Sequence, residues 1–156
     1  MKYYHYSDKI IEVVSSRSQN KGREYIGKPV GFWITDNSED NWETWSRAEE
    51  FKLECLKYKH EVELSPVADI LYITTSEELV AFHEKYSYTE KYFRDRHIIN
   101  WNKVADDYDG ILIMPYQWKH RLDGDISDWY YSWDCSSGCI WNANAIERIS
   151  IIETTS

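Results

Sequence analysis

The chain has 156 residues, of which 27 are acidic and 18 are basic, and its formal net charge is -9. A chain of this length falls in the usual range for one domain and buries roughly 70% of the surface of its unfolded form. It therefore needs no disulfide bond or structural metal to fold. The excess of negative charge argues against binding of nucleic acids through attraction to their phosphate backbone, although the chain can still carry a local basic patch.

Two features of the sequence indicate the cellular compartment of the protein. No stretch approaches the roughly 20 apolar residues that span a bilayer, and no apolar signal-peptide core follows residues 1–5. The cysteines are Cys55, Cys135 and Cys139, an odd number that gives no disulfide framework. We therefore expect a cytoplasmic protein with reduced thiols and no membrane partner.

Aromatic residues are unusually frequent. The chain contains 8 Trp, 13 Tyr and 4 Phe, together 16% of its residues, whereas hydrophobic residues overall make an ordinary 42%. Trp and Tyr combine an apolar body with a polar edge, so they pack cores and also stack on rings or sugars. Core packing does not easily explain the clustering of the aromatic residues. We therefore expect residues 129–142 to contribute to the functional surface of the protein.

In chain order, the first predicted elements are a strand, a helix and a second strand. Residues 2–6 are predicted as a short strand, after which Ser7 or Asp8 caps a helix. A polar loop follows as far as Gly27. Residues 30–35 are predicted as a buried strand. The apolar positions of the helix are Ile10, Ile11, Val13 and Val14.

Helices and strands then alternate. Asn37 or Ser38 is predicted to cap a helix, residues 61–64 alternate like a half-exposed strand, and residues 70–73 form a buried strand. The Thr-Thr-Ser-Glu sequence at 74–77 has the pattern of a capping box and predicts another helix. The apolar positions of the two helices are Trp42, Trp45 and Phe51 in the first and Leu79, Val80 and Phe82 in the second.

The remaining elements lead to a last strand. Residues 86–97 lack a clear period and are predicted as a loop or an irregular helix. Residues 100–105 favour a short helix, and a turn then leads into a strand over 111–114. The last strand is predicted over 146–152. This order favours one α+β domain over residues 1–156, with a mixed sheet and flanking helices.

The cysteines and His120 supply the ligand types that zinc prefers. Structural zinc sites usually take pairs of Cys or His ligands separated by two residues, as in Cys-x-x-Cys. Here Cys135 and Cys139 form only one, more widely spaced pair. We therefore expect no metal site and small buried cysteines beside Gly138. A hydrolase or thiol enzyme centred on Cys135 or Cys139 is an open alternative, because its histidine need only be close in space.

Three short polar-aromatic signatures remain, each at the edge of a predicted strand. They are Tyr-His-Tyr-Ser at 4–7, Phe-Trp-Ile-Thr at 32–35 and Trp-Asp-Cys-Ser-Ser-Gly at 133–138. Strand ends open onto clefts and fix side chains firmly, so three such sites can surround one ligand. Each signature alone also has a structural explanation, such as a satisfied core histidine for His5 or a turn for Asp134.

Together the signatures resemble the ADP-ribosyltransferase superfamily, above all its small prokaryotic and phage-encoded members. Those proteins split NAD in a cleft between two small packed sheets with flanking helices. They use a first-strand His or Arg, a second-strand Ser, Thr or Tyr, and a late acidic residue. The resemblance implies an NAD-dependent mono-ADP-ribosyltransferase with NAD as its substrate and a protein or nucleic-acid acceptor. It also implies a toxin or phage–host conflict role, with an antitoxin or inhibitor as a partner.

On this resemblance, His5 matches the first-strand position that holds the adenosine ribose or the nicotinamide amide. Asp134 is the acid nearest the late-strand position and is the expected catalytic residue, with Glu147 as the alternative. A count back from Ile146 ends near two serines, where the superfamily usually has Glu. The residues expected to bind NAD are His5, Tyr6, Ser7, Trp33, Thr35, Trp45, Trp133, Ser136 and Ser137, with Tyr130 as a further wall.

These residue types suit the chemistry of NAD cleavage. Breaking the bond between nicotinamide and ribose develops positive charge on the ribose, which a nearby carboxylate stabilises, while aromatic walls exclude water. Without an effective acid, the same cleft is expected to be a non-catalytic binding module for a nucleotide, a sugar or a partner protein. Nicotinamide release distinguishes the two hypotheses.

Overall fold

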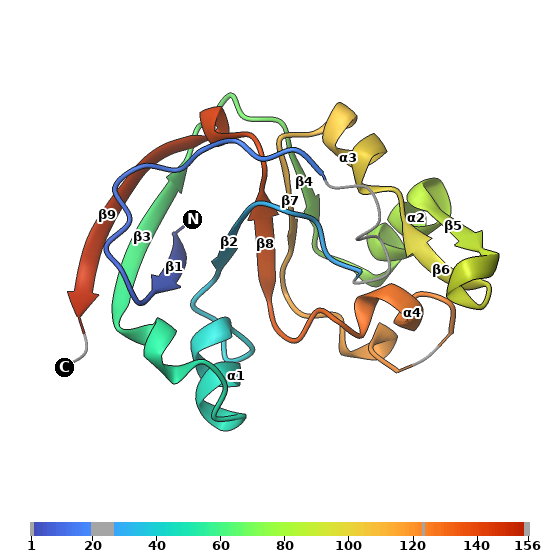
Figure 1. Cartoon of the computed structure of the whole chain (residues 1–156), viewed down its shortest axis with the longest axis horizontal. Helices are drawn as coiled ribbons and strands as arrows, with labels where there is room; N and C mark the ends of the chain where they lie inside the picture. The colour runs from blue at the N-terminus through green and yellow to red at the C-terminus, as the bar shows by residue number, and fades with distance from the viewer. Residues whose placement is uncertain (1, 20–26, 123, 155–156) are drawn as a thin grey trace.

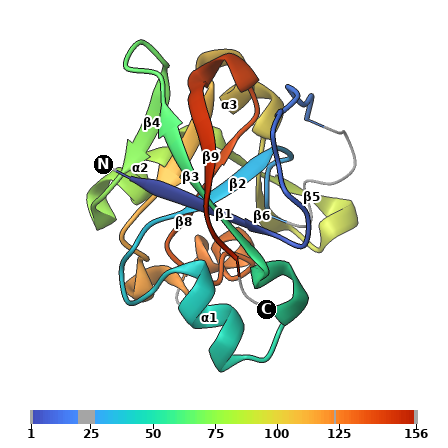
Figure 2. The ribbon, with the colours of Figure 1, turned by 90° about the vertical axis from the view of Figure 1, so that its left-hand side faces the viewer.

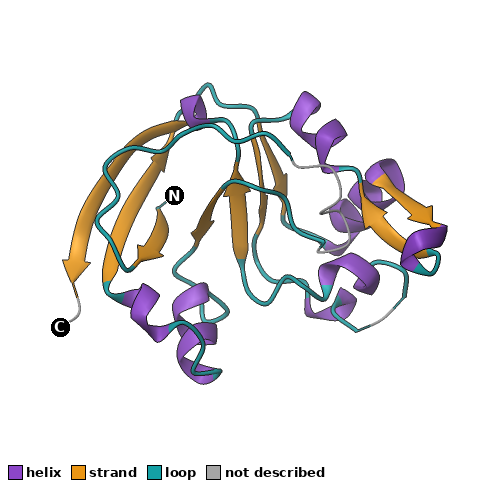
Figure 3. Cartoon of the chain, viewed as in Figure 1, coloured by secondary structure: helices purple, strands orange, loops and turns teal. Residues whose placement is uncertain are grey.

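The computed structural model describes residues 2–19, 27–122 and 124–154. Seven strands form one mixed sheet in the order β4-β7-β8-β2-β1-β3-β9, and β5 pairs with β6 in a separate hairpin (Figures 1 and 3). The strands are β1 (Tyr3–Ser7), β2 (Phe32–Thr35), β3 (Tyr58–Leu64), β4 (Ile70–Ile73), β5 (Ser87–Glu90), β6 (Arg96–Ile99), β7 (Gly110–Ile113), β8 (Ser137–Ile140) and β9 (Ile146–Thr154). The helices are α1 (Trp42–Ala48), α2 (Ser76–Tyr86), α3 (Trp101–Asp107) and α4 (Ser127–Tyr130). No helix in the described ranges is long and apolar enough to cross a membrane.

The sheet bends into an arch and is weakest at its β1–β2 junction (Figure 1). Tyr4 and Thr35 are the one register pair recorded there, whereas β1 and β3 pair over five positions and β2 and β8 over four. We call β9, β3 and β1 the β1 wing, which faces the viewer in Figure 2, and β2, β8, β7 and β4 the β2 wing. The α+β class is confirmed, but the two packed sheets implied by the resemblance are instead one nearly divided sheet.

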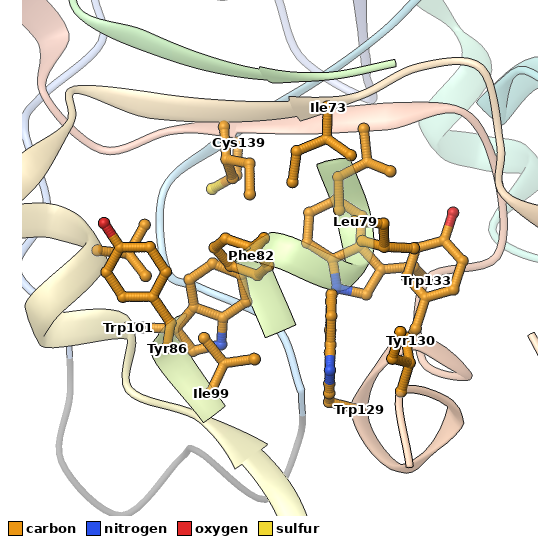
Figure 4. Packing of buried hydrophobic residues seen from close by; sticks show 14 of the residues in the cluster. Ile73, Leu79, Phe82, Tyr86, Ile99, Trp101, Trp129, Tyr130, Trp133 and Cys139 are labelled. Atoms are coloured by element: carbon orange, nitrogen blue, oxygen red, sulfur yellow. The ribbon is translucent and has the colours of Figure 1, made fainter. Parts of the chain in front are cut away.

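A tryptophan-rich core fills the space between the β2 wing and helices α2, α3 and α4. The rings of Phe82 of α2, Trp101 and Trp129 pack together, with the Phe82 centroid 5.8 and 5.6 Å from those of the two tryptophans (Figure 4). The indole of Trp129 donates a hydrogen bond to His83 at 3.0 Å, so its one polar group is satisfied inside the core. Much of the 129–142 segment is therefore core packing, and only part of it reaches the surface expected for it.

The opposite face of the sheet carries a second apolar cluster. Successive side chains of a strand point to opposite faces. Ile34 and Leu112 accordingly pack in this cluster, whereas their neighbours Trp33 and Ile111 belong to the tryptophan-rich core. Both faces of the central strand β7 are thus buried, which explains the continuous apolar run that predicted it.

Several elements form where the sequence predicts them because their signals are local. Strand β4 matches its predicted range residue for residue. The capping box of α2 is displaced by one residue: Thr75 accepts the Glu78 N–H at 3.1 Å, and the Glu78 carboxylate accepts the Thr74 N–H at 3.1 Å. The N-terminus of α3 is likewise capped by Asn100, whose side-chain oxygen accepts a hydrogen bond from the Lys103 N–H.

The helix predicted after Ser7 is wrong, since residues 8–19 contain no helix. Its four apolar positions are all β-branched residues, which are stiff in a helix. The backbone instead finds partners on the sheet: Ile11 N–H donates to the ring of His60 at 2.9 Å, and Arg17 N–H donates to the Trp141 carbonyl at 2.8 Å. Long-range contacts therefore outweigh the local helical pattern.

The loop or irregular helix predicted over residues 86–97 is also wrong, because residues 87–99 form the β5–β6 hairpin. The hairpin is fixed from outside by α4: the Asp128 carboxylate accepts the backbone N–H of His97 at 2.9 Å. Arg94 and Asp95 turn the chain with φ of 57° and 58°, a conformation that few residues other than glycine adopt. Neither feature is visible as a period in the sequence.

Gly138 offers a test of how tightly the β2 wing is packed. A Cβ at this position would lie 2.6 Å from the Ile111 carbonyl oxygen, a backbone atom that cannot move aside. We expect Gly138→Ala to lower the free energy of unfolding by about 3 kcal/mol, the upper range for overpacking. Urea unfolding followed by tryptophan fluorescence measures this. Exposed Ser150→Ala on β9 is the control, and an equally small change in both variants would contradict the packing argument.

Candidate functional site

A cleft of about 600 Å³ lies at the β1–β2 junction, between the sheet and α1. Eight of the ten predicted site residues line it, namely His5, Tyr6, Trp33, Thr35, Trp45, Trp133, Asp134 and Ser137. They converge because β1, β2 and β8 are neighbours in the sheet and present their ends at one edge. The two predicted residues that do not line the cleft are Ser7 and Ser136.

Thr35 anchors the cleft through its hydroxyl group. The side chain is only 2% exposed. The hydroxyl donates to the Ser136 carbonyl at 2.7 Å and accepts the Trp42 N–H at 2.9 Å. Its hydrogen bonds thus join the end of β2 to the start of α1 and to the chain entering β8. The structure gives Thr35 a supporting role in addition to its place in the cleft wall.

Ser136 reinforces the same junction from behind the cleft. Its hydroxyl donates to the Asp36 carboxylate at 2.6 Å, and its N–H donates to the Asp40 carbonyl at 2.7 Å. These bonds hold the loop between β2 and α1 against the strand β8. Ser137 faces the cleft, and its hydroxyl donates to the Cys135 carbonyl at 3.1 Å. Ser7 lies at the far end of β1 and accepts the Lys9 N–H at 3.1 Å.

His5 lines the cleft, and its ring is held by residues of the neighbouring strand β2. The ring stacks on that of Phe32 with centroids 4.0 Å apart. Because the Trp33 carbonyl can only accept, the His5 Nδ1–H donates to it at 2.6 Å. Burial lowers the pKa of His5 to about 4, so the ring is neutral at pH 7.

Two groups of rings form the aromatic walls. In the first, which we call the Trp33 wall, Trp33 meets Trp133 edge to face with centroids 5.0 Å apart. In the second, which we call the α1 wall, the three rings of Trp42, Trp45 and Phe51 pack together, with Trp42 stacked on Trp45 at 5.3 Å. Trp33, Trp42, Trp45 and Phe51 retain exposed surface in the cleft, whereas Trp133 is only 1% exposed and supports Trp33 from the core. Tyr130, expected as a further wall, is instead fully buried in the core.

Asp134 supplies the one carboxylate among the described residues that line the cleft. Its side chain is 24% exposed and pairs with Arg121 at 3.6 Å. Arg121 is itself fixed, because it donates to the Tyr116 hydroxyl at 2.6 Å and to the Trp133 carbonyl at 3.2 Å. The alternative acid, Glu147, is an exposed residue of the edge strand β9 and does not line the cleft.

The cysteines provide no support for thiol chemistry. Burial raises the pKa of Cys135 to about 12 and that of Cys139 well above its ordinary value, so both remain protonated at neutral pH. The thiolate is the nucleophilic form of cysteine, and these two side chains do not reach it. Within the described part of the chain, no three His, Cys, Asp or Glu side chains come together to hold a metal ion.

Some lining residues were not named as site residues from the sequence. They are Tyr4, Lys28, Ile34, Trp42, Phe51, Lys52, Cys55 and Cys135. Of these, Tyr4, Ile34 and Cys135 lie within the predicted signatures. Trp42 and Phe51 carried a usable signal, because both were predicted beside Trp45 near one helix. Lys28 and Lys52 carried none, since each lies outside the strands and helices whose periods can be read.

Comparisons of the chain with protein families, with curated proteins and with solved structures find no match. The function of the cleft is therefore inferred from its own residues and geometry.

The two hydrogen bonds of Thr35 predict different effects for two substitutions. Thr35→Val keeps the shape but leaves the Trp42 N–H and the Ser136 carbonyl without their partner, which should cost about 3 kcal/mol of unfolding free energy. Thr35→Ser keeps the hydroxyl and should cost only about 1 kcal/mol, for a lost methyl group. Chemical denaturation measures both. Equal losses in the two variants would show that the hydroxyl does not hold the junction.

His5 predicts a pH dependence of stability. Its folded pKa of about 4 lies below the ordinary value of 6.5, so the unfolded chain binds the proton more readily. The resulting stability is fully present above pH 6.5 and is lost as the pH falls through 4, by about 3 kcal/mol at pH 4. Denaturation at a series of pH values checks this. His5→Gln should flatten the slope in that window, and an unchanged slope would contradict the assignment.

Proposed function

We propose that the cleft binds NAD and that the protein is an NAD-dependent mono-ADP-ribosyltransferase acting on a protein or nucleic-acid acceptor. The observation that carries the proposal is that predicted residues from three separate parts of the chain meet at one cleft. His5 from the first strand, Thr35 from the second and Asp134 before β8 all line one cleft of about 600 Å³. This volume falls within the range of small-molecule sites, and the lining combines aromatic surface with a few polar groups.

The position of Asp134 suits the bond that is broken. As nicotinamide leaves C1 of the ribose, positive charge develops on the sugar, and a carboxylate fixed beside it stabilises that charge. Trp133 precedes Asp134 and packs against Trp33, so an aromatic surface for the nicotinamide adjoins the acid. The nucleophile of the acceptor then attacks C1, and the ADP-ribosyl group is transferred.

A second candidate is a non-catalytic binding module, and one observation favours it. Ser137 is the first residue of β8 and faces the cleft at the position near which the superfamily usually has Glu. Asp134 is moreover paired with Arg121, which offsets part of its charge. The same walls would then hold a nucleotide, a sugar or a segment of a partner protein without turnover.

Incubation with NAD tests the proposal. The protein should release nicotinamide, measured by chromatography, and should transfer labelled ADP-ribose to a component of a cell extract. Asp134→Asn should lower the rate of nicotinamide release at least about hundredfold, because its interaction is made mainly in the transition state, while NAD affinity stays within about tenfold.

The controls separate the two candidates. Asp106→Asn removes an exposed carboxylate of α3 outside the cleft lining and should leave the rate unchanged. Thermal stabilisation by NAD without any nicotinamide release selects the binding module. A folded protein that neither binds nor cleaves NAD excludes the proposed transferase.

A further inference from the structure

Two lysines enter the cleft, one from each aromatic wall. The Nζ of Lys28 lies 5.9 Å from the ring centroid of Trp33, and the Nζ of Lys52 lies 5.4 Å from that of Phe51. Both lysines belong to the cleft lining. Each wall thus presents a ring together with an ammonium group, which can also attract the ring electrostatically.

The lysines make the cleft cationic in a strongly acidic protein. The whole chain has a net charge of -9, yet among the described residues the lining contains two lysines and one carboxylate, that of Asp134. That carboxylate is already paired with Arg121. A site with local positive charge favours an anionic ligand, because its positive potential attracts anions that the acidic surface around it repels.

The backbone around Lys52 supports a specific placement of its side chain. Glu50 and Lys52 have φ of 51° and 50°, left-handed values that cost most residues other than glycine free energy. Between them, the Phe51 N–H donates to the Ser46 carbonyl at 3.0 Å. This strained corner after α1 places Phe51 and Lys52 together in the cleft lining. Strain of this kind is concentrated at functional sites.

We infer that Lys28 and Lys52 bind the diphosphate of a dinucleotide whose two ring systems lie on the two aromatic walls. Two rings joined by an anionic linker match a cleft in which each wall offers a ring and a cation. The nicotinamide end lies on the Trp33 wall, because Asp134 follows Trp133 directly and must adjoin the ribose that loses nicotinamide. The adenine end then lies on the α1 wall.

This inference rests on the proposed NAD site and specifies how the site selects its ligand. It requires affinity for ADP-ribose and ADP to depend on both lysines. Affinity for adenosine, which has no phosphate, should not depend on them. A lysine bonded to phosphate contributes a charge-assisted hydrogen bond, so removing one such charge should weaken binding about tenfold.

The test measures binding by calorimetry at fixed ionic strength with ADP-ribose, ADP and adenosine as probes. Lys28→Met and Lys52→Met keep the aliphatic stem over the ring and remove the charge. Each should weaken ADP-ribose and ADP binding about tenfold and leave adenosine binding within about threefold. Lys103→Met is the matched control, because Lys103 also lies over a ring, that of Tyr86 at 6.0 Å, and does not line the cleft.

The salt dependence gives an independent measurement. Raising the ionic strength should weaken ADP-ribose binding by the wild-type protein, and it should weaken binding by the double lysine variant less, because fewer charges are then screened. Wild-type affinity in both single variants overturns the inference. An equal loss for adenosine and ADP-ribose also overturns it, since that pattern indicates general damage to the cleft.

Nicotinamide release separates this inference from the proposed transferase activity. Lysine-dependent binding of ADP-ribose without NAD cleavage supports the diphosphate site and refutes the transferase. NAD cleavage by the wild-type protein, with ADP-ribose binding unaffected in the lysine variants, refutes the diphosphate site alone. A folded wild-type protein that binds neither ADP-ribose nor ADP and neither binds nor cleaves NAD refutes both.

Discussion

The buried hydroxyl of Thr35 is the interaction on which the cleft depends. It joins the end of β2 to the first residue of α1 and to the residue before β8. The Trp42 N–H that it accepts is one of the amides that a helix leaves unpaired in its first turn. Together with the N-cap Asn41, this one side chain fixes the start of α1 and so helps to place the aromatic α1 wall, while it also ties α1 to the strand that follows Asp134. The loop between β2 and α1 adds to this joint through the bonds of Asp36 and Asp40 to Ser136.

The β1–β2 junction explains why the cleft lies where it does. A sheet with one recorded register pair between two strands has few backbone bonds there, and side chains take over the connection. His5 donates from β1 to the Trp33 carbonyl of β2, and the Tyr6 hydroxyl donates to the Glu43 carboxylate of α1 at 3.2 Å. His5 therefore positions the two wings relative to each other. Binding sites are drawn from such locally less stable regions, because they have to accommodate a ligand.

The sequence predicts those parts whose signals are local. The cap of α2 and the apolar run of β4 are set by local residues: β4 forms over its predicted range, and the capping box of α2 begins one residue later than predicted, at Thr75. The hairpin over residues 87–99 depends on Asp128, and the path of residues 8–19 depends on His60, so no local pattern specifies them. The site follows the same rule. Motifs at strand ends identified most of the lining, because neighbouring strands bring their ends together. The direction of the His5 ring depends on the strand pairing, and the position of Lys52 depends on a left-handed turn.

The ion pair of Asp134 bears directly on whether the cleft can support catalysis. A charge-assisted hydrogen bond to a carboxylate is typically about 2.7–2.9 Å long, whereas Arg121 lies 3.6 Å from Asp134. Arg121 also directs one nitrogen to the Tyr116 hydroxyl and the Trp133 carbonyl, so it is held by groups other than the acid. A carboxylate offers roughly four acceptor positions, and one distant guanidinium leaves most of them to a ligand. Arg121 thus offsets part of the charge of Asp134 but leaves acceptor positions open on its carboxylate, and the proposed stabilisation of a cationic ribose depends on those positions.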